Sequence, residues 1–241
     1  MVHGQSLHLL PGDAYSEKLY VFRRQDIGLL LALARVSLLS PSGERAIAVD
    51  VGANVGYNAT WLALRADVNS IIAIEPNPRL VPVLEGNLGD RGHVVHAVAT
   101  RQNGQREFPV NPVNSSWSGF GNPSCMEFSL EQVPAVAIDD IIGHGAHVGL
   151  LKIDVEGHER EVLAGAHETI TRCSPVLVVE TIKDEGSLVR DLRDLTLRSH
   201  HRYRAVIANC EGYLQECSSE GPPPSANDLI LVPDWARVRT E

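Results

Sequence analysis

Four acidic residues stand at the ends of short apolar runs in this 241-residue sequence. They are Asp50, Glu75, Asp154 and Glu180. Carboxylates accept hydrogen bonds from hydroxyl groups, pair with cations and take up protons during catalysis. If the runs are parallel strands, their carboxyl ends meet at one rim, where ligands bind in open α/β sheets. The spacing therefore predicts an acidic binding rim.

A glycine-rich turn, Gly52-Ala53-Asn54-Val55-Gly56, follows the first of these acids. Gly52 lets the chain turn sharply off a strand, and Gly56 lets the backbone approach a ligand or lets a helix pack closely on the strand. Asn54 tolerates unusual dihedral angles and offers a polar side chain. The pattern GxNxG differs from the GxGxxG of dinucleotide-binding proteins. Taken alone, the turn also suits a purely structural connection from strand to helix.

Glu75 adds a second feature, because it ends the next apolar run, 23 positions after Gly52. An acid at this place can accept hydrogen bonds from both ribose hydroxyls of an adenosine. S-adenosylmethionine and NAD both contain that group. The absent third glycine favours S-adenosylmethionine, which has no pyrophosphate to bind, and a nicotinamide dehydrogenase stays open as the alternative.

Apolar runs alternate with helical patterns along most of the chain. We expect strands over residues 46–51, 70–75, 94–98, 149–155, 175–180, 204–208 and 229–232. We expect helices over residues 26–39, 77–89, 159–171 and 187–199, and another through Trp61. Continuous apolar runs alternating with helices predict a parallel sheet covered on both faces, and right-handed crossovers make it doubly wound.

The length and composition fit one α/β domain over residues 1–241, with 44% hydrophobic and 21% charged residues. Residues 1–45 are expected to form an N-terminal helical and irregular segment, with residues 1–25 irregular or in short strands. Residues 101–135 interrupt the alternation and predict a substrate-side insertion of loops and short strands. Ser115, Ser116 and Trp117 are its candidate substrate contacts, with Trp117 as an aromatic wall; a plain surface turn is the alternative.

Charge and terminal sequence exclude some classes of protein. Acidic residues outnumber basic ones by 30 to 21, and the net charge of −9 disfavours nucleic-acid binding. The N-terminus has no basic segment followed by a long apolar one, and the apolar stretch near residues 27–39 is too short to span a bilayer. The four cysteines form no CxxC pair and no zinc spacing. We expect a cytoplasmic protein that binds neither nucleic acid nor membrane.

Several segments together resemble one known family. They are Val49–Tyr57, Ile74–Pro78, Leu151–Glu159, Leu163–Ala166 and Pro175–Glu180. This combination resembles the FkbM family of class I S-adenosylmethionine-dependent methyltransferases across about residues 45–233. The resemblance implies a Rossmann-like, doubly wound sheet of seven mostly parallel strands with helices on both faces and one antiparallel strand near the C-terminal end. It also implies S-adenosylmethionine as methyl donor and, usually, O-methylation of natural products, sugars or similar small molecules.

The residues expected to contact the cofactor are Asp50, Gly52, Asn54, Gly56, Tyr57, Glu75, Pro76, His96 and Asp154. Backbone N–H groups near Gly52–Tyr57 are expected to meet the carboxylate of the donor. His96 is expected to flank the adenine, with packing at a sheet edge as the alternative. Residues 1–25 and 101–135 match the family poorly, so we expect them to select the acceptor.

Candidate catalytic residues follow the fourth run. Lys152, Asp154 and Glu156 share one face of a strand if the extended form persists. Asp154 could take the proton of an acceptor hydroxyl or orient that hydroxyl. Glu156 could do the same or could accept hydrogen bonds from amides at the start of the next helix. His158 has a suitable reference pKa for a base but also fits a plain helix start, whereas Lys152 fits a structural ion pair.

Glu180 is a candidate substrate contact, and with Asp154 it could hold a divalent metal, as in catechol-type methyltransferases. Those enzymes use an adjacent Asp-Asn pair, whereas Thr181 follows Glu180 here, so we expect no metal. The acceptor is expected to be a small molecule with a hydroxyl group. Alternatives are C- or N-methylation of a small aromatic or amine, and a protein that binds the cofactor without catalysis. The sequence specifies neither the acceptor nor the oligomeric state.

Overall fold

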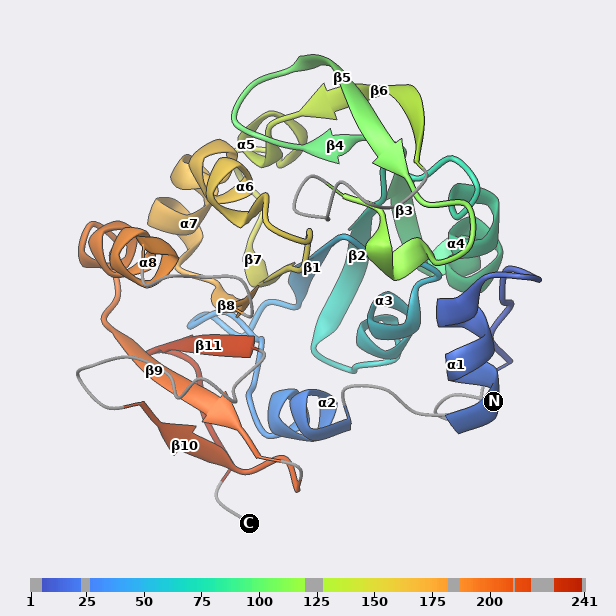
Figure 1. The fold of residues 1–241 in the computed structure, drawn as a ribbon. Coiled ribbons are helices and arrows are strands. Elements are labelled where there is room, and N and C mark those ends of the chain that lie inside the picture. Colours follow the sequence, from blue (N-terminus) through green and yellow to red (C-terminus); the bar gives the residue numbers. More distant parts are fainter. Residues whose placement is uncertain are drawn as a thin grey trace.

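An eight-stranded sheet crosses the molecule in the order β10-β9-β11-β8-β7-β1-β2-β3 (Figure 1). This computed structural model describes residues 6–22, 27–119, 128–181, 187–209, 211–217 and 228–239. The strands are β1 Ala46–Val51, β2 Val68–Ile74, β3 Gly92–Val95, β7 Val148–Ile153, β8 Val176–Glu180, β9 Tyr203–Ala208, β10 Leu214–Glu216 and β11 Asp228–Pro233. The predicted doubly wound α/β class is confirmed.

The order of the parallel strands reverses between β1 and β7. Strand β1 pairs in parallel with β2 on one side and with β7 on the other. Strand β11 runs antiparallel to both β8 and β9, as the family resemblance implied. Strand β10 pairs antiparallel with β9 at the outer edge and raises the number of strands from the expected seven to eight. The crevice beside β1 and β7 is therefore the place where such a sheet binds ligands.

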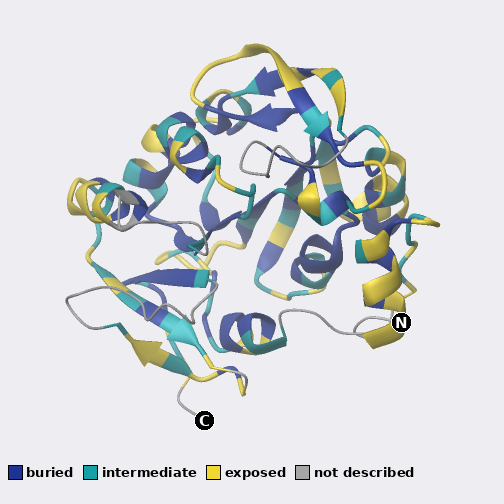
Figure 2. Ribbon diagram, viewed as in Figure 1, coloured by how far each residue is buried: buried dark blue, intermediate teal, exposed yellow. Residues whose placement is uncertain are grey.

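Helices cover both faces of the sheet. One face carries α2 (Ile27–Ala34), α3 (Tyr57–Ala63) and α4 (Val81–Leu88), and the other carries α5 (Ile138–Ile141), α6 (Glu159–Gly165), α7 (His167–Cys173) and α8 (Ser187–Leu197). Side chains along β1 alternate between the two cores, Ala48 facing one and Val49 the other. Burial on both sides explains the continuous apolar runs and the buried strands of Figure 2. None of the helices within the described ranges is long and apolar enough to cross a membrane.

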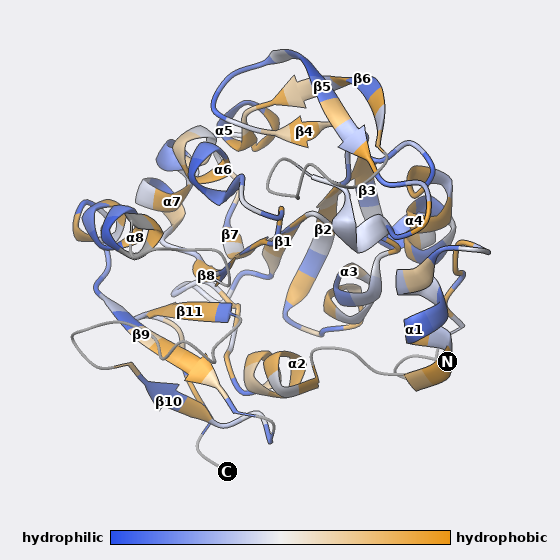
Figure 3. Cartoon of the chain, viewed as in Figure 1, coloured by the Kyte–Doolittle hydropathy of each residue, from blue (hydrophilic) through white to orange (hydrophobic). Residues whose placement is uncertain are grey.

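A second sheet of three strands, in the order β4-β6-β5, includes most of residues 101–135, where loops and short strands were expected. It consists of β4 (Val98–Ala99), β5 (Gly104–Val110) and β6 (Ser129–Val136), and β5 runs antiparallel to β6. Its small core consists of Val98, Phe108, Val110 and Val133. Exposed hydrophilic residues and buried apolar residues are mixed along β5 and β6, so neither strand is a continuous apolar run (Figure 3). The weak apolar signal of these strands explains why the sequence predicted short strands among loops but did not give their bounds or their pairing.

Other boundaries also differ from the prediction. Helix α1 (Ala14–Phe22) occupies the segment expected to be irregular or in short strands. The helix expected over residues 159–171 is divided into α6 and α7 at Ala166, whose φ is −113°. The expected run over residues 94–98 is shared between β3 and β4. Helix α2 ends at Ala34, earlier than expected, and the expected cap Asp26 lies outside the described residues.

Gly165 offers a test of the packing between α6 and the second sheet. A Cβ atom at Gly165 would lie 2.0 Å from the carbonyl oxygen of Thr100. We therefore expect Gly165→Ala to lower the free energy of unfolding by about 1–3 kcal/mol, as overpacking does. Urea denaturation measures the change.

Gly145→Ala is the matched control, because a Cβ there would meet no described atom within 4 Å. Its free energy of unfolding should stay within about 0.5 kcal/mol of the unchanged protein. Equal losses in the two variants would show that Gly165 has no special packing role.

Candidate functional site

A cavity of about 520 Å³ lies at the carboxyl ends of the central strands. The glycine-rich turn, the end of β2, the segment after β7 and the end of β8 contribute to its wall. Helix α1 and the second sheet contribute the remaining sides. The volume falls within the range of small-molecule sites.

The glycine-rich turn has left-handed backbone angles at Gly52, Asn54 and Gly56, where φ is 77°, 52° and 85°. A Cβ at Gly52 would lie 1.8 Å from the carbonyl oxygen of Asp154, so only glycine permits the two segments to approach so closely. A Cβ at Gly56 would lie 2.7 Å from Cδ1 of Leu84. Of the two roles considered for Gly56, the geometry supports close packing, in this case against α4.

Glu75 lies behind the turn and is 5% exposed. Its Oε2 accepts a hydrogen bond from the Asn54 amide, and its Oε1 accepts one from the Asn77 amide, both at 2.8 Å. Burial raises the pKa of Glu75 to about 7, although these two amides act in the opposite direction. Each carboxylate oxygen keeps further acceptor capacity toward the cavity that Glu75 lines.

A buried ammonium group connects the ends of β1 and β7. Lys152 Nζ lies 3.0 Å from Asp154 Oδ2 and 3.5 Å from Asp50 Oδ1, and the Lys152 and Asp50 side chains are 3% and 1% exposed. Burial alone would lower the pKa of Lys152, but Asp154 and Asp50 outweigh it and hold that pKa well above its ordinary value. Burial raises the pKa of Asp50, and Lys152 opposes the shift. The expected structural ion pair of Lys152 is present.

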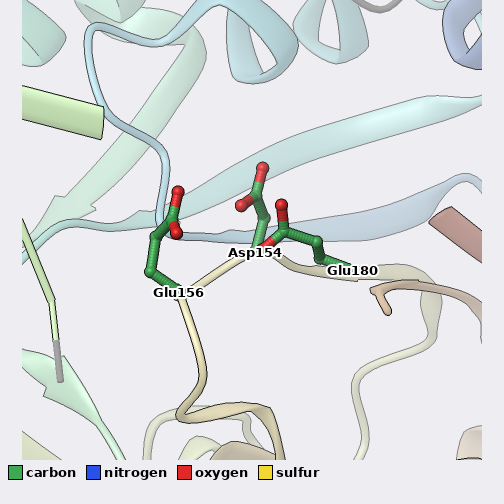
Figure 4. Close-up of side chains that lie close together, drawn as sticks. All are labelled: Asp154, Glu156 and Glu180. Atoms are coloured by element: carbon green, nitrogen blue, oxygen red, sulfur yellow. The ribbon is translucent and has the colours of Figure 1, made fainter. Parts of the chain in front are cut away.

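Three carboxylates converge in the cavity (Figure 4). One oxygen from each of Asp154, Glu156 and Glu180 lies within 4.8 Å of the others. Strand β7 ends at Ile153, and Glu156 has a left-handed φ of 57°, so the extended form expected through Glu156 does not persist. A turn brings Glu156 to the cavity instead. We call these three residues the acid cluster.

Glu159, the first residue of α6, holds the turn that precedes this helix, and the capping alternative for Glu156 stays a prediction. Glu159 Oε1 accepts hydrogen bonds from the amides of Gly157 and Val155 at 3.0 and 3.4 Å. His158 is half-buried and also lines the cavity, with Nε2 3.3 Å from Thr100 Oγ1. Burial lowers the pKa of His158. The imidazole is therefore largely neutral at pH 7 and able to accept a proton.

Burial and the neighbouring carboxylates of Asp154 and Glu156 raise the pKa of Glu180 to about 8. Like charges this close disfavour full ionisation, so the acid cluster holds a proton near neutral pH. The separation of the three oxygens would also suit one divalent cation. That no metal binds here stays a prediction.

Most of the predicted contact residues line this one cavity. They are Gly52, Asn54, Tyr57, Glu75, Pro76, Ser115, Ser116, Trp117, Asp154, Glu156, His158 and Glu180. Asp50 and Gly56 are buried and do not line the cavity, so their contact with the cofactor stays a prediction. His96 is exposed, with Nε2 3.1 Å from the carbonyl oxygen of Pro76, and it does not line the cavity. Its contact with adenine stays a prediction.

The structure adds wall residues that the sequence did not single out. They include Tyr15 and Lys18 of α1, Phe108 of β5 and Asp228 at the start of β11. Asp228 pairs with Glu180 across an antiparallel ladder, so the start of β11 meets the rim where the parallel strands end. The place of Asp228 could have been predicted from the expected antiparallel strand at the C-terminal end, because the first residue of such a strand lies where the parallel strands end. The helical segment of Tyr15 and Lys18 carried a weaker signal, the turn Pro11-Gly12-Asp13 before α1.

Comparisons with known proteins agree with this geometry. A family profile described as the methyltransferase FkbM domain matches residues 50–211, more than half of the chain. The hexuronic acid methyltransferase AglP of Haloferax volcanii is 28% identical over 147 residues, and the match covers 58% of each chain. The chain thus spans little more than half the length of that curated relative. The FkbM methyltransferase of Methylobacillus flagellatus KT has a similar fold, with a TM-score of 0.53, 17% identity and coverage of 78% of this chain and 44% of the other.

The raised pKa of Glu180 predicts a pH-dependent stability. Between its ordinary pKa of 4.5 and the folded value of about 8, the unfolded chain loses this proton while the folded chain keeps it. The free energy of unfolding therefore falls as pH rises through this window. We expect Glu180→Gln to make this decline shallower, as measured by urea denaturation at pH 5, 6.5 and 8. Glu168→Gln, an exposed change on α7, is the control; identical pH slopes in all three proteins would contradict the assignment.

Proposed function

The chain belongs to the methyltransferase FkbM family, and from that premise we propose that it methylates a hydroxyl group of a small molecule, such as a sugar or natural product. Dependence on S-adenosylmethionine comes with the family. The hydroxyl acceptor is supported chiefly by the acid cluster, which shares one cavity with the glycine-rich turn and Glu75. The glycine-rich turn and Glu75 form the end of the cavity for the methyl donor, and the acid cluster forms the end that accepts a proton.

The residues at the donor end fit S-adenosylmethionine. Glu75 accepts the two ribose hydroxyls, since its carboxylate is already oriented by the amides of Asn54 and Asn77. Tyr57 and Pro76 form part of the wall. The backbone N–H groups of Gly52–Gly56 already donate to acceptors within the protein, so the expected contact of these amides with the donor's carboxylate has no support here. When bound, the cofactor supplies an electrophilic sulfonium methyl group. Lys152 keeps Asp154 oriented at the edge of this subsite.

The acid cluster accepts the proton of the acceptor. Asp154 leads in this role, with Glu156 beside it and neutral His158 as a further acceptor. Transfer of the methyl group to the acceptor oxygen would release the hydroxyl proton, and a carboxylate of the acid cluster takes up that proton. Protonation also relieves repulsion within the acid cluster, so the three carboxyl groups act as one coupled base. The protein otherwise contributes positioning, with the reacting atoms about 3–3.5 Å apart.

The nature of the acceptor has two supports. The relative from Haloferax volcanii is named for a hexuronic acid, which is a polyhydroxylated sugar. In this chain Ser115, Ser116 and Trp117 line the cavity, and Trp117 is 46% exposed. An exposed indole offers an apolar face to a sugar ring, while serine hydroxyls pair with its hydroxyl groups.

Glu75→Gln tests the donor site. Loss of the charged acceptor should weaken binding of S-adenosylhomocysteine by about 1–3 kcal/mol in calorimetry at pH 8. Because the pKa of Glu75 is about 7, affinity in the unchanged protein should rise as pH rises through 7, where the carboxylate ionises. The pH dependence should be reduced in Glu75→Gln. Unchanged affinity in the variant would rule out the ribose contact.

Asp154→Asn tests the proton acceptor. The unchanged enzyme is incubated with labelled S-adenosylmethionine and a panel of hydroxylated metabolites, and formation of S-adenosylhomocysteine identifies an acceptor. With that acceptor we expect the variant to lose about 10²–10⁴-fold in kcat, the usual contribution of general base catalysis. Calorimetry on the same variant shows whether donor binding survives.

Two further outcomes decide between the alternatives. A shallow loss in both Asp154→Asn and His158→Ala, with an aromatic or amine acceptor, would favour C- or N-methylation, because those acceptors need less help from a base. Donor binding without turnover of any acceptor would favour a cofactor-binding protein. Activity that persists after chelation and dialysis would support the expected absence of a metal.

A further inference from the structure

A buried carboxylate outside the acid cluster, Asp13, connects three segments of the chain. Asp13 is 1% exposed and stands directly before α1. Its Oδ2 accepts hydrogen bonds from the Ser16 amide at 2.8 Å and from Ser115 Oγ at 3.0 Å. Its Oδ1 accepts a third from the Ser115 amide at 2.6 Å. Asp13 thus caps α1 and also holds a residue 102 positions away.

Ser115 passes this contact on to the glycine-rich turn. Its Oγ lies 3.2 Å from Asn54 Nδ2 and 3.3 Å from Asn54 Oδ1. A hydroxyl has one proton, and the charged Asp13 oxygen is the stronger and closer acceptor. Ser115 Oγ therefore donates to Asp13 and accepts from Asn54 Nδ2. Asn54 Oδ1 in turn accepts from the Val55 amide at 2.8 Å.

The same asparagine ends the chain of contacts at Glu75. Asn54 has a left-handed φ of 52°, and its backbone N–H donates to Glu75 Oε2 at 2.8 Å. Hydrogen bonds therefore link Asp13 to Ser115, Ser115 to the Asn54 side chain, and the Asn54 backbone to Glu75, and we call this set of contacts the Asp13 relay. It runs from the helix that covers one side of the cavity to the acid proposed to bind ribose.

We infer that Asp13 is a positioning residue for the methyl donor: its buried carboxylate locks α1 and Ser115 against Asn54 and so presets the turn and Glu75 for the cofactor. This inference rests on the proposed donor site. Helix α1 contributes Ala14, Tyr15 and Lys18 to the cavity wall, and the Ala14 amide donates to the Val113 carbonyl at 2.8 Å. The cavity wall and the turn are thereby ordered together, which lowers the cost of ordering them on binding.

A cap that only stabilises α1 would need none of the contacts with Ser115. Ser16 already adds a second interaction at this helix start, since its Oγ accepts from the Leu10 amide at 3.1 Å. The two hydrogen bonds from Ser115 to Asp13 fix the position of Ser115, which in turn contacts Asn54 of the glycine-rich turn. Cofactor affinity, measured well below the melting temperature, separates positioning from simple stabilisation.

Asp13→Asn is the main test, because it keeps the size of the side chain but replaces one acceptor oxygen by a donor. Calorimetric titration with S-adenosylhomocysteine should show a Kd raised about tenfold or more, the scale of a lost charged hydrogen bond. Ser115→Ala breaks the Asp13 relay one step later and should raise Kd to a similar extent. The double variant should then lose little more than either single variant, since both changes break one relay.

Asp139→Asn is the matched control. Its carboxylate accepts from the amides of Glu168 and Thr169 at 2.9 and 2.7 Å at the start of α7, away from the cavity. This variant should lower the melting temperature and leave Kd unchanged.

The outcomes are distinguishable. If Asp13→Asn lowers only the melting temperature, or if the Asp13 and Ser115 losses simply add, the inference is overturned. If Asp13→Asn does not fold, Ser115→Ala alone decides by its Kd. If the unchanged protein binds no S-adenosylhomocysteine, the proposed donor site fails and the inference fails with it. A raised Kd in Asp13→Asn and Ser115→Ala, with Asp139→Asn unchanged, supports it.

Discussion

The buried ammonium of Lys152 is the constraint around which the site is arranged. It lies between Asp50 on β1 and Asp154 after β7, where the order of the parallel strands reverses. Asp50 is fully buried and Asp154 is partly exposed, and without the cation between them the two carboxylates would repel each other, with Asp50 left buried and uncompensated. The ion pairs hold the two strand ends together, and Gly52 removes the side chain that would otherwise separate them. The close approach of the glycine-rich turn to the segment of Asp154, where the acid cluster begins, therefore depends on both Lys152 and Gly52.

Access to this crevice depends on segments outside the central sheet. Helix α1 and the short helical turn Ser115–Trp117 contact each other and line the cavity, while β5 contributes Phe108 (Figure 1). The Asp13 relay couples these outer segments to Asn54 through a buried carboxylate. The N-terminal segment can thus serve two purposes, because Asp13 contacts Ser115 beside the donor turn while Tyr15 and Lys18 of α1 line the cavity.

The rim acids could be predicted because the physics behind them is local. An apolar run buried on both faces predicts a parallel strand, and all such strands end at one rim, so Glu75, Asp154 and Glu180 meet in one cavity. Asp13 and Asp228 could not be found in the same way. Asp228 reaches the rim only because β11 runs antiparallel, and Asp13 acts through a partner 102 positions away. The short strands of the second sheet were expected, but their bounds and their pairing were not, because β5 and β6 have exposed residues and so lack continuous apolar runs.

The acids of the rim carry less negative charge at neutral pH than their number suggests. Burial raises the pKa of Glu75 to about 7 and that of Glu180 to about 8, so both are partly protonated. On the proposed function, a bound sulfonium cation would favour the ionised forms of nearby carboxylates, and binding would then release protons. Glu75 thereby becomes a stronger acceptor for ribose, and the acid cluster becomes ready to take the acceptor's proton. The donor would then help create the base that its own reaction requires.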